Sequence, residues 1–538
     1  MLVSHYSDSF ARDNLPPKEL LPDFINLDVL AYPDRLNAAV ELIDRNVENG
    51  RGDHPALVSP DLEWSYAELA GKVNRIANLL VSDYGFQSGN RVLIRSPNSP
   101  MMTAIYFAVL KAGGVVVATM PLLRAKELDY ILNKATVSLA FCDHRLLDEL
   151  ETAKSTSPSL GRIVTFGGDG ADTLDTAMET ASADFDAFDT ANDDVCLIGF
   201  TSGTTGEPKG TMHFHRDLLA ICDCYSARVM KPEPDERYIG SPPLAFTFGL
   251  GGLVLFPFRA GATAILLEMA PPPALLKAIE TYRATTCFTA PTAYRAMLAE
   301  PEMPDISSLR KCVSAGEPLP KATWEQWYEA TGLKLLDGLG STEMLHVFVG
   351  SAGDDIVGGA TGKPVPLYEA KVIGENGEEL PPNTVGKLAV RGPTGCRYLD
   401  DPRQTDYVQN GWNVTGDAYM VDENGYFWFQ ARADDMIISA GYNIAGPEVE
   451  GALLTHPAVA ECGVVGKPDE ARGQIVDAFV VLKPGFEAGE AMTRELQDFV
   501  KAAISPYKYP RAIEYREALP RTETGKLQRF KLRQMAAE

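Results

Sequence analysis

The chain is short of positive charge for its size. Its 538 residues include 49 Lys and Arg against 73 Asp and Glu, so the formal net charge is −24 at pH 7. Nucleic acids and anionic membrane surfaces are themselves negative, and this balance disfavours both as partners. A protein of this composition that binds an anionic small molecule must gather its cations at one place.

Long apolar runs and paired cysteines are also missing. Residues 1–24 contain no apolar signal core, and the longest uncharged apolar run, residues 245–258, is too short and too rich in glycine to span a bilayer. The eight cysteines are scattered, without the Cys-x-x-Cys pairs or neighbouring histidines of a zinc site. We therefore expect a soluble, cytoplasmic protein with reduced thiols, without membrane insertion or a nucleic-acid partner, and either monomeric or homodimeric.

A stretch rich in glycine and hydroxyl side chains follows residues 195–200, which predict a buried strand. Residues 200–210 (FTSGTTGEPKG) contain three glycines, four hydroxyl side chains and one lysine. Glycine lets successive N–H groups point at one spot, and hydroxyl and ammonium donors suit phosphate oxygens. A flexible linker does not usually carry a lysine directly behind a strand. The standard P-loop does not fit, because Pro208 precedes Lys209 and Gly210 replaces the hydroxyl residue that binds Mg²⁺.

The same stretch resembles the phosphate-binding loop of the adenylate-forming superfamily, which includes the acyl-CoA synthetases, firefly luciferase and peptide-synthetase adenylation domains. The resemblance implies that the loop grips the β- and γ-phosphates of ATP, which leave as pyrophosphate. The residues assigned to the nucleotide in this way are Thr201, Ser202, Gly203, Thr204, Thr205, Gly206 and Lys209.

A second glycine-rich run, residues 336–344 (LDGLGSTEM), follows another predicted strand. Alone, it would be an ordinary turn before a helix cap. It resembles the second adenylate-binding motif of the superfamily, which implies that Thr342 contacts the α-phosphate and Glu343 holds Mg²⁺, both as catalytic residues. Many members carry Tyr-Gly before this Thr-Glu pair, whereas residues 339–341 (LGS) have the form of aryl-CoA ligases. The resemblance adds further residues to the nucleotide site: Gly316, Glu317, Pro318, Asp337 and Gly338.

Two shorter motifs follow in the order that the superfamily has. Residues 415–417 (TGD) resemble the motif in which the carboxylate, here Asp417, accepts hydrogen bonds from both ribose hydroxyls. Residues 432–437 (RADDMI) resemble the motif in which Arg432 also reaches the ribose and Asp434 is the hinge between domains. Each string alone is more often a surface turn or an ion pair. Four motifs in the right order over most of the chain argue for the superfamily.

The last motif, residues 520–526 (PRTETGK), lies close to the C-terminus. A lysine beside a glycine is usually solvated, yet Lys526 stands where the superfamily keeps its adenylation lysine. Joining a carboxylate to the α-phosphate of ATP accumulates negative charge, which an ammonium group can neutralise in the transition state. The resemblance therefore makes Lys526 the main catalytic residue, with ATP, Mg²⁺ and coenzyme A as cofactors and co-substrates.

Two segments are expected to bind the acyl group, residues 243–250 (PLAFTFGL) and residues 344–346 (MLH). Small and aromatic side chains suit a flat ring, and His346 could hydrogen-bond a ring substituent or only orient the carboxylate. Both segments resemble benzoate- and 2-aminobenzoate-CoA ligases, the latter more closely. Alternatives are a ligase for a medium-chain fatty acid or another aryl acid, and a nucleotide-binding switch or ATPase without acyl transfer. The predicted substrate residues are Phe246, Thr247, Phe248, Gly340 and His346.

Helix and strand patterns alternate through most of the chain, which indicates parallel sheets covered by helices. We expect an α/β fold whose large N-terminal domain, residues 1–434, binds the adenylate and the acyl group and includes a small β subdomain. A hairpin is predicted within that subdomain at Asn424-Gly425. A small, mobile α+β C-terminal domain, residues 435–538, would carry Lys526. Residues 169–194, which contain no Lys or Arg, are expected to be a solvated connection.

Overall fold

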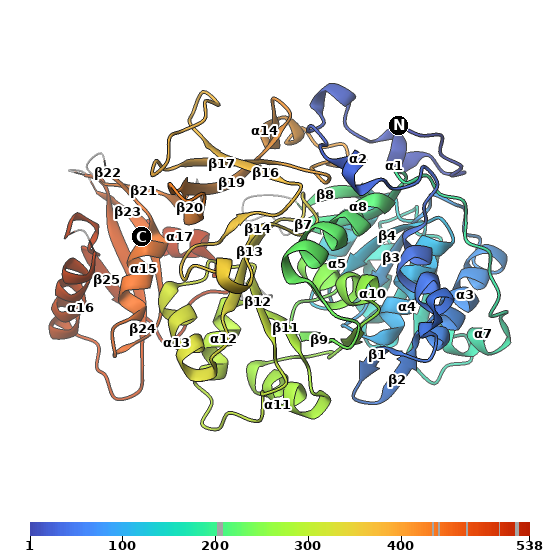
Figure 1. Ribbon diagram of the computed structural model, residues 1–538, viewed down its shortest axis with the longest axis horizontal. Helices are drawn as coiled ribbons and strands as arrows, with labels where there is room; N and C mark the ends of the chain where they lie inside the picture. Colours follow the sequence, from blue (N-terminus) through green and yellow to red (C-terminus); the bar gives the residue numbers. More distant parts are fainter. Residues whose placement is uncertain are drawn as a thin grey trace.

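Short buried strands alternate with helices over the first two thirds of the chain, as the sequence predicts. The protein is described by a computed structural model that covers residues 1–201, 208–432, 435–439, 442–469, 472–504, 506–521 and 527–537, without the side chains of Arg432, Tyr442 and Asn443. Within these ranges, the strands form four sheets, with most of the helices packed against their faces (Figure 1). The fold is α/β with parallel-rich sheets.

The first of these sheets carries the phosphate-binding segment at one edge. Its strand order is β6-β5-β3-β4-β7-β8, and its pairs are parallel except that β8 runs antiparallel to β7. The strands are β3 (Arg91–Arg95), β4 (Val115–Thr119), β5 (Leu139–Asp143), β6 (Arg162–Phe166), β7 (Val195–Thr201) and β8 (Lys209–Phe214). The helices between them are α4 (Pro100–Lys111), α5 (Ala125–Lys134), η4 (His144–Leu146), α6 (Leu147–Lys154) and α7 (Leu174–Thr180).

The second sheet, the longest among the described residues, carries the second adenylate motif. Its order is β15-β14-β13-β12-β11-β9-β10-β1-β2, parallel from β13 to β1 and antiparallel at both ends. The strands are β1 (Pro55–Ser59), β2 (Leu62–Ser65), β9 (Arg237–Gly240), β10 (Thr263–Ile265), β11 (Thr286–Thr289), β12 (Lys311–Ala315), β13 (Leu335–Gly340), β14 (Val347–Gly350) and β15 (Lys363–Pro364).

Helices around this sheet supply much of the core. The apolar run that is too short to span a bilayer forms a continuous, largely buried helical segment instead, α9 to α10. The helices are α3 (Tyr66–Ser82), α8 (His215–Ile221), η5 (Cys222–Met230), α9 (Thr247–Leu250), η6 (Gly251–Leu255), α10 (Phe256–Ala260), α11 (Pro272–Tyr282), α12 (Pro291–Leu298) and α13 (Lys321–Thr331). The shorter helices of the N-terminal part are α1 (Phe10–Asp13), η1 (Lys18–Leu20), α2 (Leu27–Leu30), η2 (Val40–Asp44), η3 (Val47–Arg51) and η7 (Gly353–Asp355).

A small antiparallel sheet follows, drawn in gold and orange along the top of Figure 1. Its elements are β16 (Glu369–Ile373), β17 (Gly386–Arg391), α14 (Gln404–Tyr407), β18 (Val408–Gln409), β19 (Trp412–Val421) and β20 (Phe427–Arg432). The predicted hairpin is confirmed, because β19 pairs with β20 and Gly425 adopts a φ of 80° in the turn. This sheet is the predicted β subdomain.

The C-terminal part gathers at one end of the molecule (Figure 1) and has its own apolar core. It is an α+β unit in which β24 pairs with three other strands. Its elements are β21 (Ile437–Ser439), β22 (Tyr442–Ile444), α15 (Gly446–Leu454), β23 (Val459–Asp469), β24 (Gly473–Leu482), α16 (Glu490–Ala503), η9 (Pro506–Lys508), β25 (Ala512–Tyr515) and α17 (Arg529–Ala537). We propose the domain boundary at residues 434 and 435, although Asp434 itself lies outside the described residues.

The acidic connection is more than a solvated linker, and that expectation is wrong for its last residues, 190–194, which are buried. Asp193 and Asp194 are buried, and they bind the N-terminal arm through the Leu2 amide (2.9 Å to Asp193 Oδ2) and Arg12 Nη1 (3.0 Å to Asp194 Oδ1). Burial raises the pKa of Asp194. Asp193 and Asp194 therefore need no Lys or Arg within their own segment, because Leu2 and Arg12 of the N-terminal arm are their hydrogen-bond partners.

All eight cysteines are free thiols, and seven of them are buried. Burial raises the pKa of Cys142 to about 12, so this thiol stays protonated and unreactive at neutral pH. Among the residues that the structure describes, no helix combines the length and the apolar character that crossing a bilayer requires.

Candidate active site

The lysine of the phosphate-binding stretch meets a carboxylate and a tyrosine from distant parts of the chain. Lys209 opens β8, Glu343 follows β13, and Tyr398 lies between β17 and α14. Residues 397–399 run beside β8, where the Met212 amide donates to the Arg397 carbonyl and the Leu399 amide donates to the Gly210 carbonyl, both at 2.8 Å. Pairing of the main chain therefore brings Tyr398 next to Lys209.

The three side chains form a compact network. Lys209 Nζ lies 2.6 Å from Tyr398 Oη and 3.4 Å from Glu343 Oε1. Tyr398 Oη donates to the same Glu343 Oε1 at 2.5 Å. Burial, reinforced by the negative charge of Glu343, holds the pKa of Tyr398 well above its usual value, so the phenol stays protonated and can donate.

Glu343 fits a Mg²⁺ ion that is shared with substrate phosphates. Only 8% of its side chain is exposed, and no hydrogen bond from another described residue reaches its Oε2. Within the described ranges, no group of three or more Asp, Glu, His or Cys side chains is placed to hold a metal. Mg²⁺ is usually held by one or two carboxylates plus phosphate oxygens and waters, so a single carboxylate beside a phosphate loop suits it.

Thr342 is packed against the base of the phosphate-binding stretch. A Cβ atom built on Gly199 in β7 would lie 3.1 Å from the Thr342 methyl carbon and 4.0 Å from that of Thr247. His213 in β8 is fully buried, and its Nε2 donates to the Thr342 carbonyl at 2.8 Å. Thr201 Oγ1 is buried without a hydrogen-bond partner among the described residues, and a phosphate oxygen would satisfy it.

The two predicted ribose residues are opposite each other. The register of β19 and β20 pairs Asp417 directly with Arg432, which places both in one cross-strand pair. The Asp417 amide donates to Thr415 Oγ1 at 3.3 Å. The contact of these residues with a ribose is a prediction that the side-chain geometry does not test, since the Arg432 side chain is not described.

The remaining predicted nucleotide residues lie at the ends of β12 and β13. Gly316, with a φ of 88°, and Pro318 are exposed, while Glu317 has one buried oxygen, Oε2, without a partner in the described part of the chain. Asp337 Oδ1 is buried and likewise unpartnered, and burial raises the pKa of this carboxyl to about 8. Gly338 continues β13 beside it. Buried unpartnered oxygens at this edge suit a polar ligand.

Asp337→Asn is expected to flatten the pH dependence of stability. The folded pKa of about 8 lies above the unfolded value of about 3.9, so the folded protein holds an extra proton between these values. The free energy of unfolding therefore falls as pH rises through this range, and the slope should be smaller in the variant by about 1.4 kcal/mol per pH unit. Urea unfolding of the ligand-free proteins between about pH 5 and pH 7.5 measures this slope. Equal slopes of the free energy of unfolding against pH in Asp337→Asn and the unchanged protein would contradict the expectation.

The predicted acyl-binding residue His346 sits in a ring of aromatic side chains, which we call the His346 cluster. Ring centroids lie 4.5 Å from His346 for Phe256, 5.7 Å for Phe248 and Tyr225, and 6.5 Å for Phe288. Burial lowers the pKa of His346 to about 3, so the imidazole is neutral.

Glycines let these rings approach the backbone. A Cβ on Gly251 would lie 2.3 Å from His346 Cδ2, and one on Gly252 would lie 2.4 Å from Phe288 Cδ1. A Cβ on Gly340 would likewise meet the His346 carbonyl at 2.8 Å. Phe246 and Thr247, at the start of α9, are half-buried beside the cluster.

Several predicted residues lie outside the described ranges: Ser202, Gly203, Thr204, Thr205, Gly206, Asp434 and Lys526. The described residues nearest to Lys526 in the sequence are Arg521 and Leu527. They form an antiparallel bridge, and Arg521 Nη1 lies 4.0 Å from Glu317 Oε1, a predicted nucleotide residue.

Sequence reasoning missed Tyr398 and His213. Neither belongs to a motif that the sequence reading identified, and Tyr398 is 189 positions away from Lys209. The repeated histidines in residues 211–215 (TMHFH) at the end of an apolar strand were the only available signal for His213.

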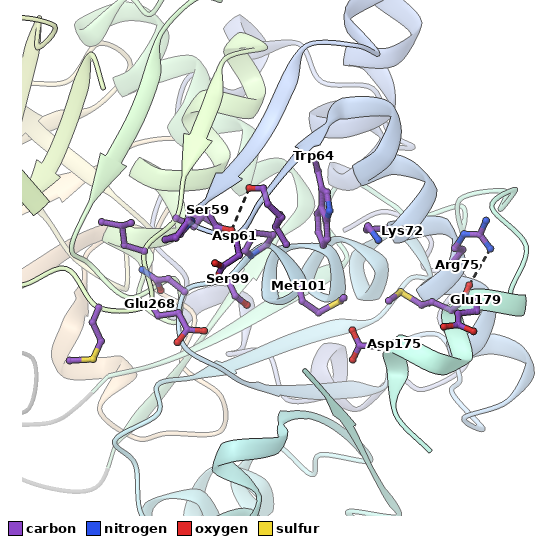
Figure 2. Close-up of a pocket in the computed structure, with 18 residues that line it drawn as sticks. Ser59, Asp61, Trp64, Lys72, Arg75, Ser99, Met101, Asp175, Glu179 and Glu268 are labelled. Carbon is purple, nitrogen blue, oxygen red and sulfur yellow. Dashed lines mark hydrogen bonds between the residues drawn. The ribbon is translucent and has the colours of Figure 1, made fainter. Parts of the chain in front are cut away.

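A cleft of about 910 Å³ lies away from these residues, between the β1–β2 turn, α3, the start of α4 and α7 (Figure 2). Trp64, with Lys72 Nζ 4.5 Å from its ring centroid, and Met101 line it, and Asp61, Asp175, Glu179 and Glu268 make its charge largely acidic. No unpartnered buried side-chain atom of the described residues belongs to its lining. The predicted nucleotide residues, by contrast, carry several such atoms.

Comparisons with known proteins agree with this geometry. The model of the family "AMP-binding enzyme" matches residues 43–397, and that of the "AMP-binding enzyme C-terminal domain" matches residues 448–526. A benzoate–CoA ligase of Thauera aromatica is 38% identical over 94% of this chain and 97% of its own length.

Two solved structures are also similar over nearly their whole lengths. The anthranilate CoA ligase AuaEII, solved in complex with anthranoyl-AMP, has a TM-score of 0.90 at 34% identity and covers 94% of this chain and 98% of its own. A benzoate CoA ligase from Burkholderia xenovorans LB400 has a TM-score of 0.85 at 31% identity, covering 93% of this chain and 100% of its own.

Proposed function

Because this chain belongs to the AMP-binding enzyme family and is an AMP-forming acid–CoA ligase that uses ATP, Mg²⁺ and CoA, we propose that its acid is an aryl carboxylate, 2-aminobenzoate before benzoate. The class of reaction excludes a nucleotide switch without acyl transfer. The choice of acid rests on the His346 cluster, and the choice of compartment, the cytoplasm, rests on the free thiols.

The proposal depends on one observation: the ring nitrogens of His346 lack hydrogen-bond partners among the described residues. Its side chain is buried, and neither Nδ1 nor Nε2 has a hydrogen-bond partner among the described residues. An unpaired polar group in an aromatic surrounding costs about 1–3 kcal/mol, so a ligand that pairs with it gains that much over one that does not. The amino group of 2-aminobenzoate supplies an N–H donor for a neutral imidazole, whereas benzoate and fatty acids supply none beside their carboxylate.

The aromatic rings support an aryl acid over an aliphatic one. The centroids of the four aromatic rings lie 4.5–6.5 Å from that of His346, the separation at which flat rings interact favourably. AuaEII, which was solved with anthranoyl-AMP, and two benzoate CoA ligases are among the similar proteins. Anthranilate is 2-aminobenzoate.

We assign the described residues to the first half-reaction by their chemistry. Lys209 and Thr201 would hold the departing phosphates, Thr342 the α-phosphate, and Glu343 the Mg²⁺ ion, which supplies charge neutralisation when bound. Asp417, with Arg432 opposite, would bind the ribose hydroxyls. The acid's carboxylate attacks the α-phosphorus, forming acyl-AMP and releasing pyrophosphate. In the second half-reaction the CoA thiol displaces AMP from the acyl carbon and gives up its proton.

His346→Leu should separate the two aryl acids. Loss of the ring nitrogens removes the partner of the amino group, so kcat/KM for 2-aminobenzoate should fall about 10- to 100-fold while that for benzoate changes by less than about threefold. AMP release in the presence of ATP, Mg²⁺ and CoA measures both values.

Phe256→Leu is the matched control, because it disturbs the packing of the same cluster but keeps the imidazole. It should lower kcat/KM for both acids by similar factors. Equal losses for both acids in His346→Leu would contradict the proposed hydrogen bond. A higher kcat/KM for hexanoate or octanoate than for either aryl acid in the unchanged protein would overturn the aryl assignment.

A further inference from the structure

The Tyr398 hydroxyl contacts both members of the long Lys209–Glu343 ion pair. Lys209 Nζ is 2.6 Å from the phenol oxygen but 3.4 Å from Glu343 Oε1. The phenol accepts from the ammonium group and donates to the carboxylate at 2.5 Å. The contact between lysine and carboxylate therefore runs mainly through the phenol oxygen.

The position of Tyr398 is fixed independently of these two partners. Its amide donates to Gln404 Oε1 at 2.9 Å, and the residues on either side of it pair with β8. Its ring packs edge-on against Tyr407, with ring centroids 5.8 Å apart, and the side chain is 1% exposed. The phenol oxygen is thus held in place by the backbone and by packing.

Both contacts fall on one oxygen of Glu343. Lys209 and Tyr398 reach Oε1, whereas Oε2 receives no hydrogen bond from any other described residue. A carboxylate that is held at one oxygen presents the other in a defined direction, which suits a metal that demands near-ideal geometry.

We propose that Tyr398 is a positioning residue that keeps the Lys209–Glu343 ion pair long, at 3.4 Å, so that Glu343 Oε2 is left for Mg²⁺ and Lys209 for phosphate. The proposal rests on the roles proposed above for Lys209 and Glu343. It adds a residue that acts through Lys209 and Glu343 and not on the reacting groups themselves.

Removal of the hydroxyl has a definite physical consequence. Without the phenol oxygen, Lys209 loses its nearest partner, and attraction to the buried Glu343 carboxylate draws its ammonium group closer. The resulting shorter pair competes with Mg²⁺ for the carboxylate and with phosphate for the ammonium group. Nucleotide affinity should then depend less on Mg²⁺.

The test compares the dissociation constant of ATP in EDTA with that in saturating Mg²⁺, measured by titration calorimetry of the full-length protein without acid or CoA. The ratio of the two constants is the Mg²⁺ enhancement. We expect Tyr398→Phe to reduce this enhancement about tenfold, since a hydrogen bond to a charged group contributes about that factor. Thioester formation from preformed acyl-AMP should change by less than about threefold.

Tyr407→Phe is the matched control, because it removes a neighbouring buried hydroxyl that contacts Ser341 Oγ at 3.3 Å and not Glu343. It should leave the Mg²⁺ enhancement within about twofold of the unchanged protein. Glu343→Gln tests the proposed metal role of Glu343 separately from the proposed role of Tyr398. If it leaves the enhancement intact, the proposed metal role of Glu343 is wrong. If it removes the enhancement while Tyr398→Phe keeps it, the role of Tyr398 is wrong.

Discussion

Lys526→Ala should slow acyl-AMP formation about a thousandfold and leave thioester formation from preformed acyl-AMP within about tenfold of the unchanged protein. The carboxylate and the α-phosphate are both anionic, and negative charge accumulates as they join. In a site with little water, an ammonium group next to that charge stabilises the transition state, and not the ground state, by several kcal/mol. The second half-reaction has a neutral thiol or its thiolate as nucleophile and does not bring the same two anions together.

Arg521, which precedes Lys526 in the sequence, lies near a predicted nucleotide residue. Arg521 and Leu527 bridge each other, and Arg521 lies 4.0 Å from Glu317 and 2.8 Å from Glu461, so it spans the N-terminal and C-terminal parts. Pyrophosphate release measures the first half-reaction, and thioester formation from synthetic acyl-AMP measures the second.

A second lysine of the C-terminal part provides the control. Lys501→Ala in α16 removes an exposed ammonium that pairs with Asp498 at 2.8 Å, and it should leave both half-reactions unchanged. Equal losses in the two half-reactions of Lys526→Ala would show that this lysine does not act in adenylation alone. A loss below about tenfold in the first would remove it from catalysis.

Arg397→Met should destabilise the protein by about 3–5 kcal/mol. Both partners of the Arg397–Asp217 ion pair are 0% exposed, and Nη1 lies 2.6 Å from Asp217 Oδ2. The guanidinium also packs over the ring of Phe214 at 3.8 Å. Removal of the cation leaves a buried carboxylate without its counter-ion, which costs far more than the pair itself contributes. The urea midpoint at neutral pH measures the loss.

Neutralising the carboxylate should restore part of that stability. Arg397→Met with Asp217→Asn keeps an oxygen that can accept from the Phe214 amide, as Asp217 does at 3.0 Å, but removes the unpaired charge. The pair holds the pKa of Asp217 below its usual value, so its stabilisation is present above the unfolded pKa and disappears as pH falls through the folded one. A double variant no more stable than Arg397→Met alone would contradict this account.

Local signals in the sequence are enough to predict several of the elements. Ser65 and Glu68 form the capping box that opens α3, and the apolar runs at residues 91–95 and 115–119 are strands with those limits. The end of strand β13 is harder to predict from the sequence, because it contains Gly338 and Gly340, which pair with β14. Glycine has little intrinsic strand preference, and only the partner strand makes these residues extended.

Long-range features could not be predicted in this way. The sequence placed Lys209, Thr342 and Glu343 in one site through their motifs, and the structure brings them together. Tyr398 and the Arg397–Asp217 pair carry no local pattern, because their contacts form between segments 55 to 189 positions apart. A buried arginine can be recognised only when its counter-ion is located, and that is a property of the tertiary structure.

The pairing of residues 397–399 with β8 also bears on how the chain folds during synthesis. Strand β8 is the last strand of its sheet, so its outer edge has open N–H and C=O groups until these residues emerge from the ribosome. An open strand edge next to an apolar sheet invites pairing with another chain. Nascent chains and fragments that stop short of this segment should therefore be the ones that depend most on chaperones.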